Sequence, residues 1–467
     1  MRLGQIIRNC SAEIIRGNAE SEICAICSDS RKVTPGALFI AVKGCKVDGH
    51  QFIDAAVAAG AEAVVSTDRR GLALIADAFY GHPSGKLNLV GITGTNGKTT
   101  TVTLLYNMFR NMGYECGLLS TIANYVGLKR LETANTTADP KTINSLLDEM
   151  VNAGCEYGFM EVSSIGIEQD RVTGLEFKVG IFSNLTHDHL DYHGTFAEYL
   201  RCKKQFFDNL PDKAFAITNI DDRNGLVMVQ NTTATTVTYS CRSGADHTCR
   251  IVEEGFEGML LKIDGTEVWT RLVGAHNAYN VLAVYCTAVA LGTDKDEALV
   301  AISKLNSAPG RLENLRGPRD ISVIIDYAHT PDALENVLKT LRDVAPERKL
   351  ICLFGCGGDR DKTKRPEMAA VAERFADSIF ITSDNSRSER TEDIIEDIRK
   401  GLSLEGQAKA ICIPDRKEAI RAAIITAPAG ATILLAGKGH ETYQIIGSET
   451  LHFDEREITE EIFKTIR

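Results

Sequence analysis

The sequence has no long apolar run, and this absence argues against one class of protein. Nowhere in its 467 residues does an apolar stretch approach the roughly 20 residues that a membrane-spanning helix needs. The opening residues Met1–Gly4 do not begin the apolar core of a signal peptide. We therefore expect a cytoplasmic protein without a membrane span.

The sequence also lacks an excess of positive charge and a regular spacing of its cysteines. The chain has 52 Lys and Arg against 63 Asp and Glu, a net charge of -11, so we expect no nucleic-acid partner. Its 13 cysteines are scattered along a long chain, which is more typical of reduced thiols than of a disulfide framework. Cys24 and Cys27 form one CxxC pair without a second pair, so a packing role is favoured over a metal site.

The length predicts about three domains. Strands and helices alternate along most of the chain, which indicates an α/β fold with mostly parallel sheets. Breaks at 80–85 and 307–313 resemble a linker and a hinge. We predict domains at 1–85, 86–310 and 311–467.

A glycine-rich turn between a predicted strand and a predicted helix is the strongest motif. The apolar run 87–90 leads into 91–101, where Gly94 and Gly97 precede Lys98 and Thr99. Glycines let backbone N–H groups face a polyphosphate, while lysine adds charge and the hydroxyl can bind Mg²⁺. The spacing is shorter than the usual phosphate loop, so an ordinary strand–turn–helix corner is the alternative.

Several polar side chains follow the next strands. Glu161 ends an apolar strand, where an unpaired carboxylate is costly, so we favour Mg²⁺ coordination. Residues 186–194 hold three histidines and two aspartates in a spacing unlike standard zinc sites, so a role at Mg²⁺ or phosphate is favoured. Asn277 and Asn280 lie three apart on one predicted helical face; they suit a nucleobase edge, although helix N-capping is a rival role for Asn277.

Four strands of the last domain each end in a glycine-rich or charged cluster. Carboxyl ends of parallel strands meet at one edge of a sheet, so this pattern predicts a ligand site there. The clusters are 326–331, 355–362, 383–387 and 437–441.

These motifs together resemble the Mur ligase family, and the resemblance covers essentially the whole chain. The matching stretches are Gly94–Thr100, Glu161–Ser164, Asn184–Asp191, Gly310–Glu313 and Asp326–Pro331. The resemblance implies three domains: a UDP-binding N-terminal domain, a central P-loop ATPase domain with a mostly parallel sheet, and a Rossmann-like C-terminal domain that binds an amino acid.

Within the family, the chain is most similar to enzymes that add the third peptide residue. The discriminating stretches are 135–137, 191–194, 354–362 and 437–441. The implied reaction is ATP-dependent addition of meso-2,6-diaminopimelate to UDP-N-acetylmuramoyl-L-alanyl-D-glutamate through an acyl phosphate, in peptidoglycan biosynthesis. The implied partners are these substrates, and a monomer is expected.

One motif of the amino-acid site departs from the family pattern. Diaminopimelate enzymes have Asp-Asn-Pro-Arg, whereas this chain has Asp384, Asn385, Ser386 and Arg387, which keeps the arginine and loses the proline. L-lysine therefore remains an alternative substrate, and Arg387 has the alternative role of pairing with Glu389. A folylpolyglutamate synthetase-like ligase and an NTP-gated regulatory protein are the other readings.

The resemblance also implies residue roles. The catalytic residues are Lys98, Glu161, His189 and Lys203. The Mg²⁺ ligands are Thr99, Glu161, His189 and a carbamylated Lys203 (N6-carboxylysine), selected over Lys204 because it lies four residues after Tyr199. ATP is assigned to Gly94, Thr95, Asn96, Gly97, Lys98, Thr99, Thr100, Asn277, Asn280, Arg311 and Asp326. The UDP-linked dipeptide is assigned to Ser28, Ser30, Cys45, Lys46, Val47, Asn135, Thr136, Thr137, Ser163, Gln169 and Arg171. Diaminopimelate is assigned to Arg360, Asp384, Asn385, Ser386, Arg387, Gly437 and Glu441.

Overall fold

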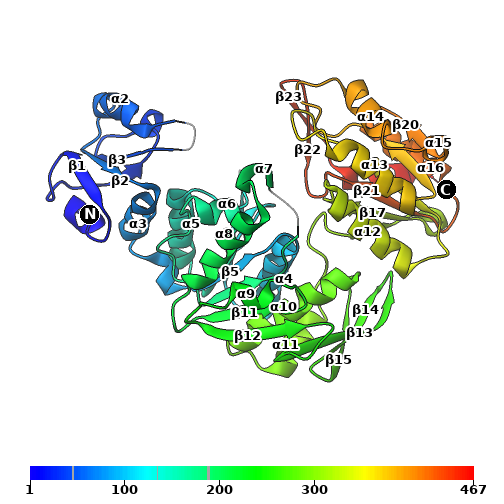
Figure 1. Ribbon diagram of the computed structural model, residues 1–467, viewed down its shortest axis with the longest axis horizontal. Helices are drawn as coiled ribbons and strands as arrows, with labels where there is room; N and C mark the ends of the chain where they lie inside the picture. The colour runs from blue at the N-terminus through cyan, green and yellow to red at the C-terminus, as the bar shows by residue number, and fades with distance from the viewer. Residues whose placement is uncertain (45–46, 134, 187–189, 467) are drawn as a thin grey trace. The chain divides into compact units, whose positions relative to one another are not determined.

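The computed structural model describes residues 1–44, 47–133, 135–186 and 190–466 (Figure 1). The chain divides into two compact units, the first consisting of Met1–Arg250, Lys262–Val268 and Ala278–Leu305, and the second of Ile251–Leu261, Trp269–Asn277 and Asn306–Arg467. The predicted domain boundaries near 85 and 310 stay predictions. No helix among the described residues is both long and apolar enough to cross a membrane.

The N-terminal part of the first unit is a small α/β layer. Its four-stranded sheet has the order β1-β4-β3-β2, in which β1 is antiparallel to β4 and the other neighbours are parallel. Apolar side chains from both faces of β3 are buried, among them Phe39 and Ile40. The elements are α1 (Leu3–Ile6), β1 (Ala12–Arg16), β2 (Ala25–Cys27), β3 (Ala37–Val42), α2 (Ile53–Ala58), β4 (Ala63–Thr67) and α3 (Arg69–Phe79).

A larger sheet follows, and the phosphate-loop strand lies inside it. The order is β15-β14-β13-β12-β11-β10-β5-β9-β6-β7-β8, parallel from β13 to β6 and antiparallel from β6 to β8. This confirms the predicted mostly parallel sheet. Its strands are β5 (Asn88–Thr93), β6 (Cys116–Leu119), β7 (Asn124–Val126), β8 (Lys129–Leu131), β9 (Tyr157–Glu161), β10 (Val179–Phe182), β11 (Phe215–Asn219), β12 (Thr235–Ser240), β13 (His247–Gly255), β14 (Gly258–Ile263) and β15 (Thr266–Thr270).

Helices connect the strands of this sheet. The helix predicted after the glycine-rich turn is α4, which buries Val102, Leu105, Met108 and Phe109 on one face. Asp139 caps the helix that begins at Pro140. The helices are α4 (Lys98–Asn111), α5 (Pro140–Asn152), α6 (Ser164–Glu168), α7 (Leu190–His193), α8 (Phe196–Asp208), α9 (Gly225–Met228), α10 (Ala275–Ala290) and α11 (Lys295–Ile302).

The second unit has a six-stranded sheet with a buried core on each face. The order is β16-β17-β21-β18-β19-β20, and only the β16–β17 pair is antiparallel. Along β17, Ile324 packs into one core with α12, α13 and α14, whereas Val323 and Ile325 pack into another with α16 and α17. The strands are β16 (Glu313–Arg316), β17 (Ser322–Asp326), β18 (Leu350–Phe354), β19 (Ser378–Ile381), β20 (Ala410–Cys412) and β21 (Thr432–Ala436).

Helices surround this sheet and a hairpin follows it (Figure 1). The apolar residues of β17 and β21 alternate between the two faces, so both faces need a helical cover. The remaining elements are α12 (Pro331–Val344), α13 (Lys364–Phe375), α14 (Thr391–Arg399), α15 (Leu404–Ala408), α16 (Arg416–Thr426), β22 (Tyr443–Ile446), β23 (Glu449–His452) and α17 (Glu455–Thr465).

Candidate active site

At two positions of the loop between β5 and α4, only glycine fits. Gly94 has a φ of 152° and Gly97 a φ of 87°. A Cβ at Gly94 would lie 2.0 Å from the Ser183 hydroxyl, and one at Gly97 would lie 2.5 Å from Asn280 Oδ1. The neighbouring elements therefore pack directly against the loop backbone, as a cradle for a phosphate chain requires.

Side chains fix the path of this loop. Asn184, which follows β10, accepts the Asn96 backbone N–H on Oδ1 at 2.9 Å and the Thr95 N–H on its carbonyl oxygen at 2.8 Å. Lys98 Nζ reaches back along the loop and donates to the carbonyls of Gly94 and Thr95, both at 2.9 Å. The loop thus carries a fixed positive charge beside the N-terminus of α4, an arrangement that favours an anionic ligand.

A buried carboxylate stands beside the first turn of α4. Glu161 is 1% exposed, and its Oε1 accepts hydrogen bonds from the Thr99 hydroxyl at 2.9 Å and the Thr121 N–H at 2.8 Å. A hydroxyl and a carboxylate are hard oxygen ligands, which suit Mg²⁺. Among the described residues, no group of three or more His, Cys, Asp or Glu is arranged to hold a metal. The predicted ligand His189 lies outside the described residues.

Lys203 and Lys204 on α8 face different surroundings. Lys203 is 1% exposed, its Nζ donates to the Gly94 carbonyl at 2.9 Å, and it lies 4.7 Å from the centroid of the Tyr199 ring. Lys204 Nζ instead pairs with Asp208 at 2.5 Å. Lys203 is therefore the lysine that reaches the phosphate loop.

The residues predicted for the dipeptide meet next to this carboxylate. The Thr137 hydroxyl donates to the Glu161 carbonyl and accepts the Ser163 N–H, both at 2.9 Å. Arg171 Nη1 donates to the Thr137 carbonyl at 2.6 Å, and its Nη2 donates to Gln169 Oε1 at 2.7 Å. Both hydrogen-bonding functions of the Thr137 hydroxyl are used within the protein, so it orients its neighbours.

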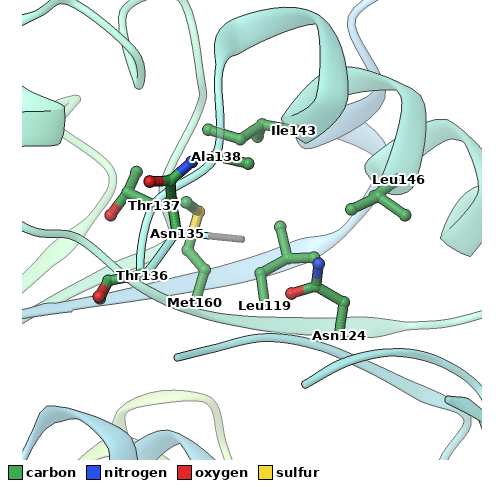
Figure 2. Close-up of a pocket in the computed structure, with 9 residues that line it drawn as sticks. All are labelled: Leu119, Asn124, Asn135, Thr136, Thr137, Ala138, Ile143, Leu146 and Met160. Carbon is green, nitrogen blue, oxygen red and sulfur yellow. The ribbon is translucent and has the colours of Figure 1, made fainter. Parts of the chain in front are cut away.

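Asn135, Thr136 and Thr137 also line a small cavity (Figure 2). The Thr136 hydroxyl accepts a hydrogen bond from the Thr121 hydroxyl at 3.1 Å. Thr121 therefore contacts both Thr136 and Glu161. The other lining residues are Leu119, Asn124, Ala138, Ile143, Leu146 and Met160.

The residues predicted for UDP follow two neighbouring parallel strands. Ser28 and Ser30 come after β2, and the segment that begins at Lys43 comes after β3, so both leave the sheet at the same edge. Val47 is 52% exposed, and its carbonyl accepts the Gly44 N–H at 3.0 Å. The predicted contacts Cys45 and Lys46 lie outside the described residues.

In the second unit, four parallel strands end in register. Asp326 pairs with Ala436, which pairs with Phe354, which pairs with Ile381. The clusters that follow these residues consequently leave one edge of the sheet together. This confirms the arrangement of strand ends that the sequence predicts for the last domain.

Two of the residues predicted to bind the incoming amino acid, one after β19 and one after β21, are in contact. Asn385 Nδ2 donates to Glu441 Oε2 at 3.0 Å. A Cβ at Gly437 would lie 2.8 Å from Asp384 Oδ2, so glycine there lets the carboxylate approach the backbone. The predicted contact Arg360 is exposed.

Arg387 is held without the family's proline. Its backbone has a φ of 52°; its N–H donates to the Ile445 carbonyl at 3.2 Å, and its carbonyl accepts the Gly447 N–H at 2.8 Å. Nη1 donates to the carbonyls of Gly358 at 2.9 Å and Asn385 at 3.3 Å. The β22–β23 hairpin thus supplies the order that a proline would give, and the neighbouring Ser386 is 2% exposed.

Glu389, the alternative partner of Arg387, is engaged elsewhere. Its carboxylate pairs with Arg365 at 2.9 Å and with Lys362 at 2.9 Å. Hydrogen bonds from these cations hold the pKa of Glu389 at about 2. The structure therefore places Glu389 with two other cations and leaves Arg387 to the cluster after β19, in which its Nη1 donates to the Asn385 carbonyl.

Asp326 and Arg311 form a further polar group of the second unit. Asp326 accepts the N–H groups of Leu312 at 2.7 Å and Ala328 at 2.8 Å. Burial raises the pKa of Asp326, against the lowering effect of Arg311 and these hydrogen bonds. The Arg311 guanidinium lies 5.0 Å from the centroid of the Tyr327 ring.

Some assignments from the sequence need correction or addition. The N-cap alternative for Asn277 is wrong, because Asn277 lies inside α10 and its Nδ2 donates to the Val273 carbonyl at 2.7 Å. Sequence reasoning missed Ser183, Asn184 and Lys438 as supports of the site. Asn184 and Lys438 lie within the sequence motifs 184–191 and 437–441, but no local sequence pattern indicates which side chains these residues contact.

Three family descriptions match the chain in order. "Mur ligase family, catalytic domain" matches residues 22–84, "Mur ligase middle domain" matches 92–288, and "Mur ligase, glutamate ligase domain" matches 310–439.

Whole-length relatives agree with these matches. A protein of Phocaeicola vulgatus named UDP-N-acetylmuramoyl-L-alanyl-D-glutamate–2,6-diaminopimelate ligase is 49% identical over 99% of both chains. A protein of the same name from Cytophaga hutchinsonii is 47% identical over the full length of both. A solved structure of a ligase of this name has a TM-score of 0.72 and 30% identity, covering 100% of this chain and 99% of its own. The chain belongs to the Mur ligase family.

Proposed function

We propose that this chain is an ATP-dependent ligase that joins meso-2,6-diaminopimelate to UDP-N-acetylmuramoyl-L-alanyl-D-glutamate in peptidoglycan synthesis. One observation carries the proposal: Asp384, Glu441 and Arg387 follow strands that end at one sheet edge, and Asn385 contacts both Glu441 and Arg387. A substrate end with an ammonium and a carboxylate needs an anion and a cation side by side. Relatives at 47–49% identity bear this reaction's name.

The first step forms an acyl phosphate. The D-glutamyl carboxylate attacks the γ-phosphorus of ATP, and ADP leaves. Lys98 and the amides of the 94–97 loop hold the phosphates, so the gain comes from positioning and charge neutralisation. In the second step the diaminopimelate amine attacks the acyl carbon, and phosphate leaves.

Mg²⁺ fits the oxygen ligands of Thr99 and Glu161, and we assign a second Mg²⁺ to His189 and a carbamylated Lys203. The bound ions would neutralise charge on the transferred phosphoryl group. An unmodified Lys203 ammonium would repel a cation, whereas a carbamate changes its charge from +1 to -1 and supplies hard oxygens. The buried position beside Gly94 supports this modification.

The remaining contacts are proposed by position. The nucleotide also uses Asn277, Asn280, Arg311 and Asp326. Arg171, Ser163 and the 135–137 stretch hold the dipeptide, while Ser28, Ser30 and the 45–47 loop hold UDP. The enzyme is proposed to act in the cytoplasm as a monomer.

Rival functions make different assay predictions. An L-lysine ligase would share every ATP contact and differ only in the third amino acid. A folylpolyglutamate synthetase-like ligase would not need the UDP-linked dipeptide. A regulatory NTPase would release phosphate without any acceptor.

The test is phosphate release with each substrate omitted in turn. The proposal expects release only when ATP, the UDP-linked dipeptide and diaminopimelate are all present, and a product whose mass contains both acceptors. A panel of other amino acids, including L-lysine, completes the assay. Release without the dipeptide, or equal use of L-lysine, would contradict the proposal.

A further inference from the structure

Lys438 is a fully buried cation that the proposed function does not use. Its side chain is 0% exposed, although it lies in the segment between β21 and β22. An ammonium group removed from water needs close anionic or carbonyl partners to offset the lost hydration. Its surroundings therefore show what it holds in place.

The partners of Lys438 are the predicted amino-acid contacts. Its Nζ lies 3.2 Å from Asn385 Oδ1, 3.1 Å from Glu441 Oε2 and 3.7 Å from Asp384 Oδ1. These three residues come from the ends of two different strands. One side chain thus joins both halves of the cluster.

Lys438 also decides which way the Asn385 amide points. An ammonium group only donates hydrogen bonds, so it must face the amide oxygen, which also accepts the Ile445 N–H at 2.9 Å. The amide nitrogen is then left to donate to Glu441 Oε2 at 3.0 Å. Glu441 Oε2 therefore accepts hydrogen bonds from both Asn385 and Lys438. The other carboxylate oxygen, Oε1, is not the acceptor in either bond.

The charges around Lys438 suit a substrate end that carries both an ammonium and a carboxylate. Three carboxylates, Asp384, Glu441 and Glu455, lie near three cations, Lys438, Arg416 and Arg387, so their charges sum to zero. A zwitterionic substrate end leaves that sum unchanged. Without Lys438 the sum would be -1 in a largely buried cluster. Tyr327 and Tyr443 also lie beside this cluster.

We propose that Lys438 is a positioning residue that sets Glu441 and Asn385 for an ammonium group of the incoming diaminopimelate, without touching the substrate itself. This inference rests on the proposed function. Its scope is narrow: Lys438 affects how the third amino acid is bound and leaves the ATP and dipeptide contacts alone.

Lys438→Met tests the inference, because methionine replaces the unbranched stem of the side chain up to the position of Cε and removes the ammonium group. Steady-state kinetics of the full chain are measured with ATP, the UDP-linked dipeptide and diaminopimelate varied in turn. We expect KM for diaminopimelate to rise about 10- to 100-fold, as for the loss of a charged hydrogen-bonding partner. KM for the other two substrates should stay within about twofold. Lys417→Met is the matched control, since Lys417 is an exposed lysine paired with Glu461.

A second variant keeps the test decisive if Lys438→Met does not fold. Lys438→Arg retains the charge, but the planar guanidinium group cannot occupy the position from which the compact ammonium group contacts all three partners. We expect an intermediate rise in KM for diaminopimelate alone, with thermal unfolding near that of the wild type. A change in all three KM values together, or an unchanged KM for diaminopimelate in a folded variant, would overturn the inference. If the wild-type chain itself does not use diaminopimelate, the proposed function fails instead.

Discussion

Removing the Arg387 side chain should change which amino acid the enzyme accepts. Diaminopimelate and L-lysine share an amine-bearing chain and differ by a distal carboxylate. In Arg387→Ala the backbone bonds to Ile445 and Gly447 remain, because they do not involve the side chain. The loop should therefore keep its path while the guanidinium is lost.

The size of the expected loss in kcat/KM for diaminopimelate follows from the guanidinium nitrogens of Arg387 that can still bind a carboxylate. In the described part of the chain, the hydrogen bonds of the Arg387 guanidinium are made by Nη1, which donates to two carbonyls. Nε and Nη2 are the two donors left for a carboxylate. A paired contact with a charged acceptor contributes about 3 kcal/mol, or roughly a hundredfold in kcat/KM. L-lysine lacks that carboxylate, so its value should change only a few-fold.

The assay compares kcat/KM for the two amino acids in the wild type and in Arg387→Ala. Wild type should prefer diaminopimelate by about a hundredfold, and the variant should lose most of that preference. Arg390→Ala, which removes an exposed arginine from the same segment, is the control. A wild-type enzyme that prefers L-lysine, or a variant that loses both activities equally, would refute this reasoning.

Three other perturbations have defined outcomes. Lys203→Ala should abolish product formation and regain part of it with an added short carboxylate, whereas Lys204→Ala should stay near wild type; full activity in Lys203→Ala would contradict the carbamate. Arg416→Met should lower the free energy of unfolding by about 3 to 5 kcal/mol in thermal denaturation, because it leaves a buried carboxylate unpaired; an unchanged melting temperature would argue against that pairing. Burial acts to raise the pKa of Asp377, but hydrogen bonds from Arg342 and other donors outweigh it and lower the pKa to about 2. The resulting stability is present above about pH 4 and lost as the pH falls toward 2, so Asp377→Asn should destabilise the protein at pH 7 by about 1 to 2 kcal/mol and much less at pH 2; a pH-independent difference would count against this.

The strand ends could be predicted from the sequence because they combine two local signals. An apolar run of five or six residues predicts each buried strand, and a charged or glycine-rich cluster marks its end. On this basis Glu161, Asp326 and Asp384 were placed at the end of a strand or just beyond one, as the structure has them. Parallel pairing then brings such ends together without further information.

The buried ionic contacts could not be predicted in the same way. Arg416 donates to the carbonyls of Ser383 and Ala436 and to Glu455, which come from three separate segments. In the sequence Arg416 is simply a charged residue in an amphipathic helix. Only the packing of α16 and α17 on the sheet turns it inward, and that packing is a property of the assembled unit.

Thr121 gives two proposed ligand sites a common support. Its N–H donates to the carboxylate of Glu161, and its hydroxyl donates to Thr136. The 135–137 stretch and the proposed metal ligand Glu161 are therefore linked through one residue. Thermodynamic linkage makes such coupling reciprocal, so any effect of the dipeptide on Mg²⁺–nucleotide affinity must equal the effect of Mg²⁺–nucleotide on dipeptide affinity. Two affinities measured in separate experiments would thus share one coupling factor.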